Sequence, residues 1–275
     1  MKLIAFARNL QKMGLRRHFL RKTPMIPAER HERILAELAR RGTISAQELA
    51  ALLDASLATV RRDIAELDAR KAVTRTHGGA SLPQGREELP YDAKMMAFLS
   101  EKRRIGAQVG ALIAPGSMIG LGGGTTVLQI LPAIRRMRLK LVTTAVNVAL
   151  DLRGAQGVEV TLTGGTLRPR TAEMVGHVAE RTLRDIHIDV AVIGVDGIDA
   201  IAGFTTYDSS EAYVNRVMLE QAREVWIAAD HSKFGRILPA LICPAHQVRR
   251  IITDTGATLA MTAPLEALGV EVLRV

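Results

Sequence analysis

Short apolar runs alternate with amphipathic stretches over residues 91–275, and this alternation limits the possible fold more than any other feature of the chain. Most of the runs are continuously apolar, as in strands that are covered on both faces. Strands that alternate with helices predict a doubly wound α/β sheet. The expected strands are 117–121, 140–143, 158–162, 189–195, 224–228, 249–253 and 271–275, and the expected helices between them include 101–113, 127–131, 209–222 and 264–268.

The composition excludes several other classes of protein. A single cysteine, Cys243, rules out a disulfide within the chain and a cysteine-cluster metal site, and the seven histidines show no metal-ligand spacing. No apolar run approaches the roughly eighteen residues of a membrane span. Hydrophobic residues make up 48% of the chain but aromatic residues only 3%, so we expect an aliphatic core. These observations predict a cytoplasmic globular protein with no metal, no cofactor and no membrane partner.

The positive charge is unevenly distributed along the chain. The formal net charge is +9, and residues 1–24 carry seven basic side chains and no acidic one. We interpret this stretch as an unstructured extension, or as the product of a start assigned upstream of Met25. The alternative is a basic arm that contacts phosphates. Residues 81–90 (SLPQGREELP) read as a linker between a domain at 25–80 and a domain at 91–275.

Residues 28–80 have the pattern of three short helices followed by a hairpin. The first is expected at 28–41, where Gly42 stops it, and the second opens at a capping box formed by Ser45 and Glu48. The third is expected at 58–70, with one apolar stripe facing inward. Two helices joined by a tight turn and followed by a basic hairpin are typical of a winged helix-turn-helix.

The third helix presents polar and basic residues away from its apolar stripe. Arg62 points almost directly away from the stripe, and Thr59 and Arg61 flank it. A small helical domain with a solvated charged face would show a similar pattern, but the capped helix, tight turn and basic hairpin together favour DNA binding. The block 25–80 has nine basic and eight acidic residues, so its affinity for phosphates should be modest in a single protomer. The expected DNA contacts are Ser56, Thr59, Arg61, Arg62 and His77.

A glycine-rich loop follows the first strand of the second domain. Residues 122–126 (GGGTT) lie between this strand and a helix, where backbone N–H groups, a helix N-terminus and two hydroxyls suit a phosphate. The loop lacks the lysine of a Walker motif and the spacing of a dinucleotide fingerprint. A tight turn without a ligand remains the alternative.

Other polar residues follow later strands of the sheet. Asp196 and Asp199 could form an acid–base pair, bind sugar hydroxyls or cap a turn, and Lys233 could neutralise a phosphate or lie solvated on the surface. We expect Cys243 to be buried rather than nucleophilic, and Trp226 to be a packing residue.

The sequence resembles the DeoR family of bacterial transcriptional regulators over nearly all of residues 26–275. The resemblance is carried in the first domain by ERHERI at 29–34, SLATVRRD at 56–63 and RTHGGA at 75–80. In the second domain it is carried by EKRRIG at 101–106, LTGGTL at 162–167, GVDGID at 194–199, GFTT at 203–206 and ADHSKFG at 229–235.

The resemblance implies a winged helix-turn-helix joined to a sensor domain similar to ribose-5-phosphate isomerase. It further implies a repressor of a carbohydrate-metabolism operon, with operator DNA and a phosphorylated sugar as partners. A homo-oligomer, dimer or tetramer, is expected because a symmetric operator needs two reading heads. The expected effector contacts are Gly122, Gly123, Gly124, Thr125, Thr126, Asn147, Gly165, Asp196 and Lys233.

This sequence departs from the common family pattern at three places. Gly122 and Gly123 stand where many members have Asp-Ser, Thr144 where many have Asn, and Asn215 where many have Lys. The lost acid and lysine leave the phosphate loop plausible but put the identity of the sugar in doubt.

Two other functions are weighed against the repressor. A sugar-phosphate isomerase fused to a DNA-binding domain would need a general base, for which Asp196 and Asp199 are candidates. The isomerase's Lys-Gly-Gly-Gly-Gly stretch has no match in GFTTYD at 203–208, and Asn215 lies near the place of its basic Glu, so we predict no catalytic residues. The other alternative is a constitutive DNA-binding protein with a vestigial pocket.

Overall fold

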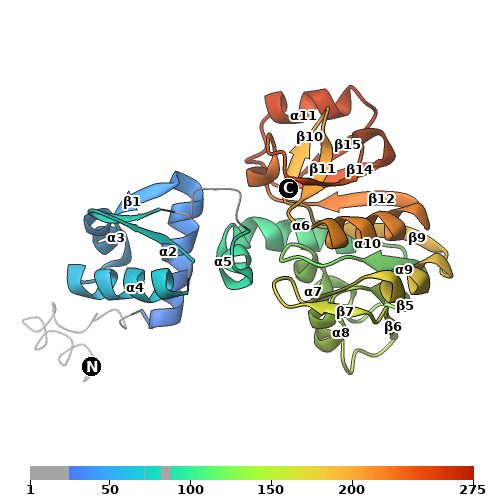
Figure 1. Cartoon of the computed structure of the whole chain (residues 1–275), viewed down its shortest axis with the longest axis horizontal. Coiled ribbons are helices and arrows are strands. Elements are labelled where there is room, and N and C mark those ends of the chain that lie inside the picture. The colour runs from blue at the N-terminus through green and yellow to red at the C-terminus, as the bar shows by residue number, and fades with distance from the viewer. Residues whose placement is uncertain (1–24, 71, 82–87) are drawn as a thin grey trace, which may run out of the picture.

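The computed structural model describes residues 25–70, 72–81 and 88–275 of the chain. The predicted extension at 1–24 and most of the predicted linker at 81–90 therefore lie outside the described residues. Figure 1 shows two parts, which we call the winged-helix part (residues 25–81) and the α/β part (residues 98–275), with one short helix between them.

Three helices form the winged-helix part, close to where the sequence places them. Ser45 caps the second helix as predicted, because its hydroxyl accepts a hydrogen bond from the Glu48 amide while Glu48 reaches back to the Ser45 amide. The third helix begins one residue earlier than expected, since Ser56 is its N-cap. The bounds are α2 (Pro27–Arg41), α3 (Ala46–Leu53) and α4 (Leu57–Ala69).

A three-stranded antiparallel sheet completes this part. The predicted hairpin is present as β2 (Thr74–Thr76) and β3 (Gly79–Ser81), and β3 also pairs with β1 (Thr43–Ser45), a strand that was not predicted. Gly79 must be glycine, because a Cβ there would collide with the backbone of Ile44 on the neighbouring strand. The pairing ties the hairpin to the helices.

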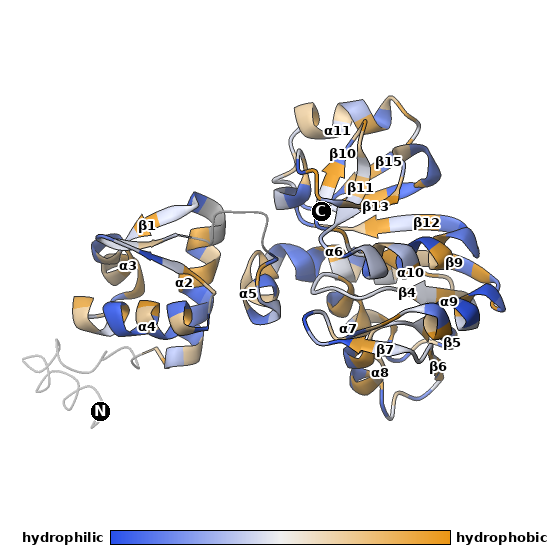
Figure 2. Ribbon diagram, viewed as in Figure 1, coloured by the Kyte–Doolittle hydropathy of each residue, from blue (hydrophilic) through white to orange (hydrophobic). Residues whose placement is uncertain are grey.

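The apolar stripe of α4 faces inward. Val60, Ile64 and Leu67 are almost fully buried and pack with the inner faces of α2 and α3. Figure 2 shows the corresponding bands of hydrophobic and hydrophilic residues along α4. The opposite face of α4 is thereby left to solvent.

A seven-stranded parallel sheet forms the centre of the α/β part. Each of the seven predicted strands is a strand of this sheet, in the order β15-β14-β12-β9-β4-β5-β6. The bounds are β4 (Met118–Leu121), β5 (Leu139–Thr143), β6 (Val158–Leu162), β9 (Ile188–Ile193), β12 (Ala222–Ala228), β14 (Arg250–Thr253) and β15 (Glu271–Arg274).

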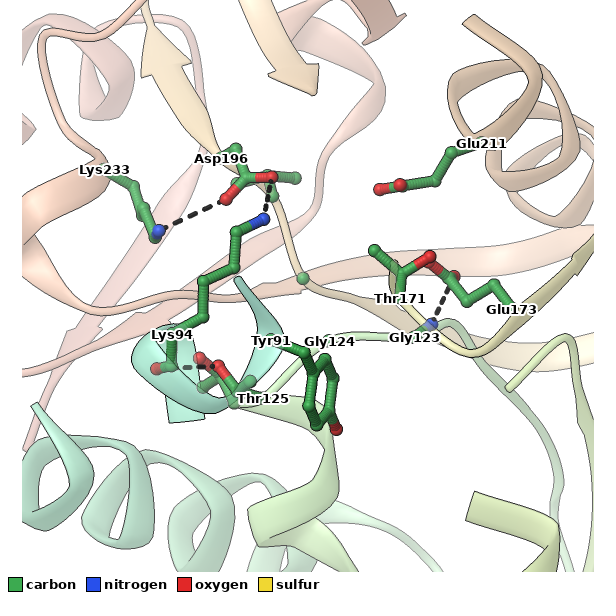
Figure 3. A pocket seen from close by; sticks show the side chains of 13 residues that line it. Tyr91, Lys94, Gly123, Gly124, Thr125, Thr171, Glu173, Asp196, Glu211 and Lys233 are labelled. Carbon is green, nitrogen blue, oxygen red and sulfur yellow. Dashed lines mark hydrogen bonds and ion pairs between the residues drawn. The ribbon is translucent and has the colours of Figure 1, made fainter. Parts of the chain in front are cut away.

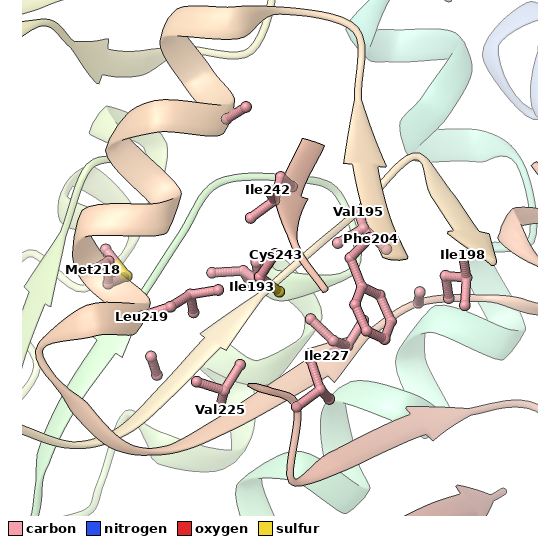
Figure 4. Packing of buried hydrophobic residues seen from close by; sticks show 14 of the residues in the cluster. Ile193, Val195, Ile198, Phe204, Met218, Leu219, Val225, Ile227, Ile242 and Cys243 are labelled. Carbon is pink, nitrogen blue, oxygen red and sulfur yellow. The ribbon is translucent and has the colours of Figure 1, made fainter. Parts of the chain in front are cut away.

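Helices cover both faces of the sheet, so the doubly wound prediction is confirmed. Alternate residues of one strand enter different cores: Ala191 and Ile193 pack on the side of α9 and α10, and Val192 packs on the side of α6 and α7. Figure 4 shows the first of these cores around Phe204 and Cys243. The helices are α5 (Tyr91–Met96), α6 (Leu99–Leu112), α7 (Leu131–Ile134), α8 (Val146–Asp151), α9 (His177–Arg184), α10 (Ser209–Glu220) and α11 (Leu259–Glu266), with short 3₁₀ turns η2 (Val127–Ile130), η3 (His231–Lys233) and η4 (Ala245–Gln247).

Five short strands of the α/β part were not predicted from the sequence. They form a two-stranded and a three-stranded antiparallel sheet, and each has only three or four residues, too few to show a clear pattern. They are β7 (Thr166–Arg168), β8 (Glu173–Val175), β10 (Gly197–Asp199), β11 (Gly203–Thr206) and β13 (Ala240–Cys243). Among the described residues, no helix has the length and apolar character needed to span a bilayer.

The sheet has a topological switch point between β4 and β9. The chain runs from β4 outward through β5 to β6, then returns to the other side of β4 and continues outward from β9. In open α/β sheets, ligands bind beyond the carboxyl ends of the strands at such a point. Residues 122–126 follow β4 and residues 194–196 follow β9, so the glycine-rich loop lies at the expected place.

Candidate functional site

One candidate interface is the solvent side of α4 with the hairpin β2–β3, which we call the α4–wing face. Arg61 and Arg62 are exposed on α4, and His77 is exposed on the hairpin. A hollow of about 310 Å³ separates helix and hairpin and is lined by Arg61, Arg75 and His77. Arg75, which sequence reasoning did not select, adds a third exposed guanidinium to this face.

The acidic residue that follows these two arginines serves a different purpose. Asp63 is turned inward, where its carboxylate accepts hydrogen bonds from Arg30 Nε at 2.7 Å and Arg30 Nη2 at 2.9 Å. His31 Nε2 lies 3.2 Å from the same carboxylate. The Asp63 side chain is 3% exposed, so this ion pair fixes α4 against α2. The Arg-Arg-Asp segment thus presents two residues to solvent and one to the core.

Two other predicted DNA contacts lie at the N-terminus of α4. The Ser56 hydroxyl accepts a hydrogen bond from the Thr59 amide at 3.1 Å, and the two hydroxyl oxygens lie 2.8 Å apart. Ser56 is exposed and Thr59 is half-buried. These residues define the start of the helix, and their hydroxyls remain on the α4–wing face.

The second candidate site is a small cavity at the switch point, which we call the switch-point pocket. Its volume is about 50 Å³, and it lies between the loop after β4, the end of β9 and helix α5 (Figure 3). Pockets that bind small molecules commonly measure about 300–1,000 Å³, so this pocket is small for a metabolite. Its lining is Tyr91, Lys94, Gly123, Gly124, Thr125, Thr126, Thr171, Glu173, Gly194, Val195, Asp196, Glu211 and Lys233.

Six of the nine predicted effector contacts line this pocket. They come from three separate segments of the chain and are Gly123, Gly124, Thr125, Thr126, Asp196 and Lys233. The other three predicted residues, Gly122, Asn147 and Gly165, are not among its lining residues.

Each of those three residues has another structural task. Gly122 packs against Asn215 and Ile193, which leave no room for a side chain. Asn147 lies behind the pocket wall, where its Nδ2 donates to the Tyr91 hydroxyl at 2.6 Å. Gly165 adopts a φ of 117° in a turn where a Cβ would meet a carbonyl oxygen of β8, at Val175.

Two lysines share one carboxylate on one side of the pocket. Lys94 Nζ lies 2.9 Å from Asp196 Oδ2, and Lys233 Nζ lies 3.3 Å from Asp196 Oδ1. Burial alone would raise the pKa of Asp196, but the ammonium groups of Lys233 and Lys94 outweigh it and hold that pKa well below its usual range. Asp196 is therefore an anion that neutralises two cations, and it is a weak base.

Lys94 has a second acidic partner. Its ammonium lies 2.9 Å from Glu88 Oε1, and Glu88 also pairs with Arg168 of β7. Burial lowers the pKa of Lys94, but Asp196 and Glu88 more than compensate, so the net shift is upward. Lys94 is consequently held charged within a buried network that connects α5 to the α/β part.

Two buried carboxyl groups lie on the other side of the pocket. Glu173 Oε1 accepts a hydrogen bond from the Gly123 amide at 2.8 Å, and Glu211 Oε1 accepts one from the Thr206 hydroxyl at 2.9 Å. Burial raises the pKa of both groups, and the neighbouring Glu173 raises that of Glu211 further. The Glu173 carboxyl occupies an amide of the glycine loop that would otherwise be free for an anion.

Sequence reasoning missed Tyr91, Lys94, Thr171, Glu173, Gly194, Val195 and Glu211 as pocket residues. Gly194 begins the GVDGID segment quoted for the resemblance, which offered a signal for that residue. Glu173 lies on β8, a strand too short to predict, and Glu211 lies in the first turn of α10 without a distinctive motif. Lys94 lies on a six-residue helix beside the predicted linker.

Two of the three departures from the family pattern are neighbours in space. A Cβ on Gly122 would lie 2.9 Å from Asn215 Oδ1, and that oxygen is buried and has no hydrogen-bond partner among the described residues. The third departure, Thr144, places its hydroxyl 3.4 Å from Glu173 Oε1. The sequence changes therefore cluster behind the glycine loop.

The remaining candidates have structural explanations. Asp199 accepts hydrogen bonds from the amides of Ile201 and Ala202, so it caps a turn. Cys243 is buried, which raises its pKa to about 12, and Trp226 is packed between α6 and the sheet. Within the described ranges, no three His, Cys, Asp or Glu side chains lie close enough together to hold a metal ion.

A winged helix with exposed arginines, joined to a parallel α/β domain with a charged pocket at its switch point, defines the class of ligand-responsive transcriptional regulators. Comparison with known families agrees with this class. The family model "DeoR-like helix-turn-helix domain" matches residues 30–86, and "DeoR C terminal sensor domain" matches residues 98–255. The chain belongs to the DeoR family of transcriptional regulators.

Curated relatives match over most of the chain. The glycerol-3-phosphate regulon repressor of Escherichia coli (strain K12) is 32% identical over 84% of this chain and 92% of the relative. The HTH-type transcriptional regulator GlpR of Haloferax volcanii is 33% identical over 90% and 98%. The HTH-type transcriptional repressor GlcR of Bacillus subtilis (strain 168) is 31% identical over 90% and 96%.

Solved structures resemble the chain more weakly. Ribose 5-phosphate isomerase A from Methanocaldococcus jannaschii has a TM-score of 0.37 and 16% identity, over 52% of this chain and 56% of that chain. The structure titled "Probable sor Operon Regulator" from Shigella flexneri has a TM-score of 0.38 and 12% identity, over 62% of this chain and 89% of that chain. These scores are too low to add to the fold described above.

Proposed function

We propose that this chain is a transcriptional repressor of a carbohydrate-metabolism operon, controlled by a phosphorylated sugar or a related metabolite. The observation that carries this proposal is the convergence of a glycine loop, two hydroxyls and two lysines in one pocket at the switch point. Amides, hydroxyls and ammonium groups are the donors that an anionic phosphate requires. The named relatives include a glycerol-3-phosphate regulon repressor, which supports a phosphorylated effector.

The DNA-binding role rests on the α4–wing face. Ser56, Thr59, Arg61, Arg62 and His77 lie on this face, and Arg75 joins them. We propose that α4 enters the major groove, where an arginine can donate two hydrogen bonds to a guanine, while the hairpin contacts the backbone. A homodimer or tetramer would present two such faces to a symmetric operator in the cytoplasm.

An isomerase activity has less support. The expected base, Asp196, is neutralised by Lys94 and Lys233, and its pKa is held low, so it is poorly suited to remove a proton from carbon. Asp199 is occupied by two backbone amides. We therefore propose that the pocket binds its ligand without converting it, and that no residue of this chain has a catalytic role.

The first experiment is thermal melting of the full chain with inorganic phosphate, glycerol 3-phosphate, ribose 5-phosphate, glucose 6-phosphate and the unphosphorylated polyol and sugars. A ligand at one hundred times its Kd should add roughly 2.7 kcal/mol to the free energy of unfolding, which gives a clear rise in Tm. The phosphorylated compounds should stabilise the protein and their unphosphorylated counterparts should not. Stabilisation by neither set would favour a vestigial pocket and a constitutive DNA-binding protein.

A matched variant tests the location of the phosphate. Replacing Thr125 and Thr126 together by alanine removes two hydroxyls from the glycine loop, and we expect it to weaken the phosphate-dependent Tm shift. The double variant Thr161→Ala with Thr163→Ala, on and after β6 outside the pocket lining, should keep the shift. A normal shift in the Thr125 and Thr126 variant would reject the phosphate-loop assignment.

A further inference from the structure

Helix α5 lies between the winged-helix part and the α/β part (Figure 1). It has only six residues, Tyr91–Met96, yet it contacts both parts. Its polar side chains reach the switch-point pocket, while Ala93 and Met96 pack with the core of the winged-helix part. Because α5 contacts both the pocket and the winged-helix core, a movement of this helix could link the two.

Polar contacts fasten α5 to the pocket. Lys94 pairs with Asp196, the Tyr91 hydroxyl accepts a hydrogen bond from Asn147, and the Lys94 carbonyl accepts one from Lys102 Nζ. The Thr125 hydroxyl of the glycine loop also donates to the Lys94 carbonyl, at 3.4 Å. An anion bound by the glycine loop would therefore compete with existing contacts of α5.

Apolar contacts fasten the same helix to the winged-helix part. Ala93 is 2% exposed and belongs to the cluster formed by the inner faces of α2 and α4, and α5 packs directly against α2. An open hollow of about 230 Å³, lined in part by Leu35, Leu67 and Met96, borders this joint. Close-packed interiors resist displacement, so the hollow leaves α5 room to shift on this side.

The pocket must widen to admit a sugar phosphate. Its volume of about 50 Å³ is well below the range typical of small-molecule sites. Two of its walls, the loop after β4 and the segment after β9, continue directly from central strands of the sheet. The wall made by Tyr91 and Lys94 belongs to a helix that is outside the sheet. Displacing α5 would widen the pocket without moving the central sheet.

We propose that Lys94 binds the anionic group of the effector, and that the resulting displacement of α5 against α2 transmits effector binding to the α4–wing face. This inference rests on the proposed function and specifies how its two sites are coupled. Lys94 would break its ion pairs with Asp196 and Glu88 to bind the phosphate. Because Ala93 and Met96 lie on the same helix, the packing of α5 against the winged-helix core would change as well. Lys233, which touches the same carboxylate from the loop after β12, would bind the anion without transmitting the signal.

The test compares Lys94→Met with Lys233→Met in the full chain. The operator is first obtained by selecting wild-type binding sites from random duplex DNA, and DNA affinity is then measured with and without saturating anion. The four anions are inorganic phosphate, glycerol 3-phosphate, ribose 5-phosphate and glucose 6-phosphate, and calorimetry of each variant establishes saturation. Coupling between two sites typically changes affinity about 5–150-fold, and we expect the wild type to fall in this range.

We expect the change in DNA affinity to shrink to less than about twofold in Lys94→Met and to persist in Lys233→Met once the anion is saturating, on the coupling scale above. Both variants should bind the anion more weakly than the wild type does. A Lys94→Met protein that still changes its DNA affinity as the wild type does would overturn the inference while leaving the proposed function intact. A wild type that binds an anion without any change in DNA affinity would overturn both this inference and the control by effector that the proposed function states.

A second variant addresses damage to the pocket. Met96→Ala alters the winged-helix side of α5 and leaves the pocket charges in place. We expect this variant to reduce the effect of the anion on DNA affinity. Its Kd for the anion should stay within about twofold of the wild-type value, a small change beside the roughly 5–150-fold typical of coupling. Unchanged coupling in Met96→Ala would contradict transmission through α5. If none of the four anions binds the wild type, the proposed function fails, and this inference fails with it.

Discussion

The α4–wing face and the switch-point pocket are assembled from the chain in opposite ways. The face comes from one continuous segment, residues 56–77, and its arginines point outward because the apolar stripe of the same helix points inward. The pocket combines residues from 91 to 233, and most of its polar groups are paired with one another. A local site can be derived from periodicity, whereas a site built from distant segments also depends on which side chains the fold brings together.

The largest expected effect separates the inward and outward residues of α4. Asp63→Ala leaves the Arg30 guanidinium, which is 13% exposed, without its carboxylate, and we expect a loss of about 3 kcal/mol in the stability of the winged-helix part, the lower end of the range for a buried ion pair. Hydrogen exchange of the amides in α2 and α4 measures this loss. Glu66→Ala, on the exposed side of the same helix, should change the exchange free energies by no more than about 0.5 kcal/mol. Equal effects of the two variants would contradict the assignment of Asp63 to the core.

The next prediction concerns the pair of departures behind the glycine loop. Gly122→Asp adds a carboxylate against Asn215 Oδ1, where it has no cation, and should destabilise the α/β part. Asn215→Lys in the same protein supplies that cation, so the double variant should be more stable than the sum of the single changes by roughly 0.5–3 kcal/mol. Urea unfolding followed by fluorescence of Trp226, the only tryptophan, measures all four proteins. A coupling of zero would show that the two positions vary independently.

A smaller free-energy change is expected from the arginines of the α4–wing face, and it concerns DNA binding. Arg62→Ala removes a bidentate donor, and we expect a loss of about 1–3 kcal/mol of discrimination between the selected operator and a scrambled duplex. Competition binding of the full chain measures this difference. Arg70→Ala, in the C-cap of the same helix, should keep the discrimination. Unchanged specificity in Arg62→Ala would reject the proposed docking of α4.

Much of the fold could be predicted because its signals are local. Each strand of the central sheet has four to seven residues and is rich in aliphatic side chains, and the alternation of strands with helices along the chain was enough to expect helices on both faces of the sheet. The order of strands within the sheet was not predicted, and it is this order that brings residues 122–126 next to residues 194–196. The glycine loop and Asp196 were therefore found as separate candidates, and the fold joined them in one pocket.

The acidic half of the pocket could not be predicted for a physical reason. Glu173 and Glu211 are buried carboxyl groups, and composition and periodicity treat glutamate as a surface residue. Their burial depends on partners far away in the chain, such as the Gly123 amide for Glu173 and Arg168 for Glu211. Asn147 was predicted as an effector contact because it comes shortly after a strand of the sheet. In the structure its side chain donates a hydrogen bond to the Tyr91 hydroxyl instead.

The last prediction concerns the pH dependence of stability that a buried lysine beside the pocket confers. Burial lowers the pKa of Lys102 to about 8, although Asp230 acts in the opposite direction, and its ammonium donates to the Lys94 carbonyl. Between this pKa and the unfolded value of about 10.4, the unfolded chain holds a proton that the folded chain has lost. The stability of the wild type relative to Lys102→Met should therefore rise with pH across this interval, by at most about 1.4 kcal/mol per pH unit.

Urea unfolding of both proteins from pH 7 to 10, followed by Trp226 fluorescence, measures this difference directly. Below pH 8 the lysine is protonated in both the folded and the unfolded state, so the difference should be nearly flat there, with the wild type bearing the full cost of the buried charge. Taking the difference between the two proteins cancels the titration of groups that they share. A difference that stays constant up to pH 10 would mean that Lys102 keeps its proton, because the Asp230 carboxylate then offsets the cost of burying the ammonium that supports α5.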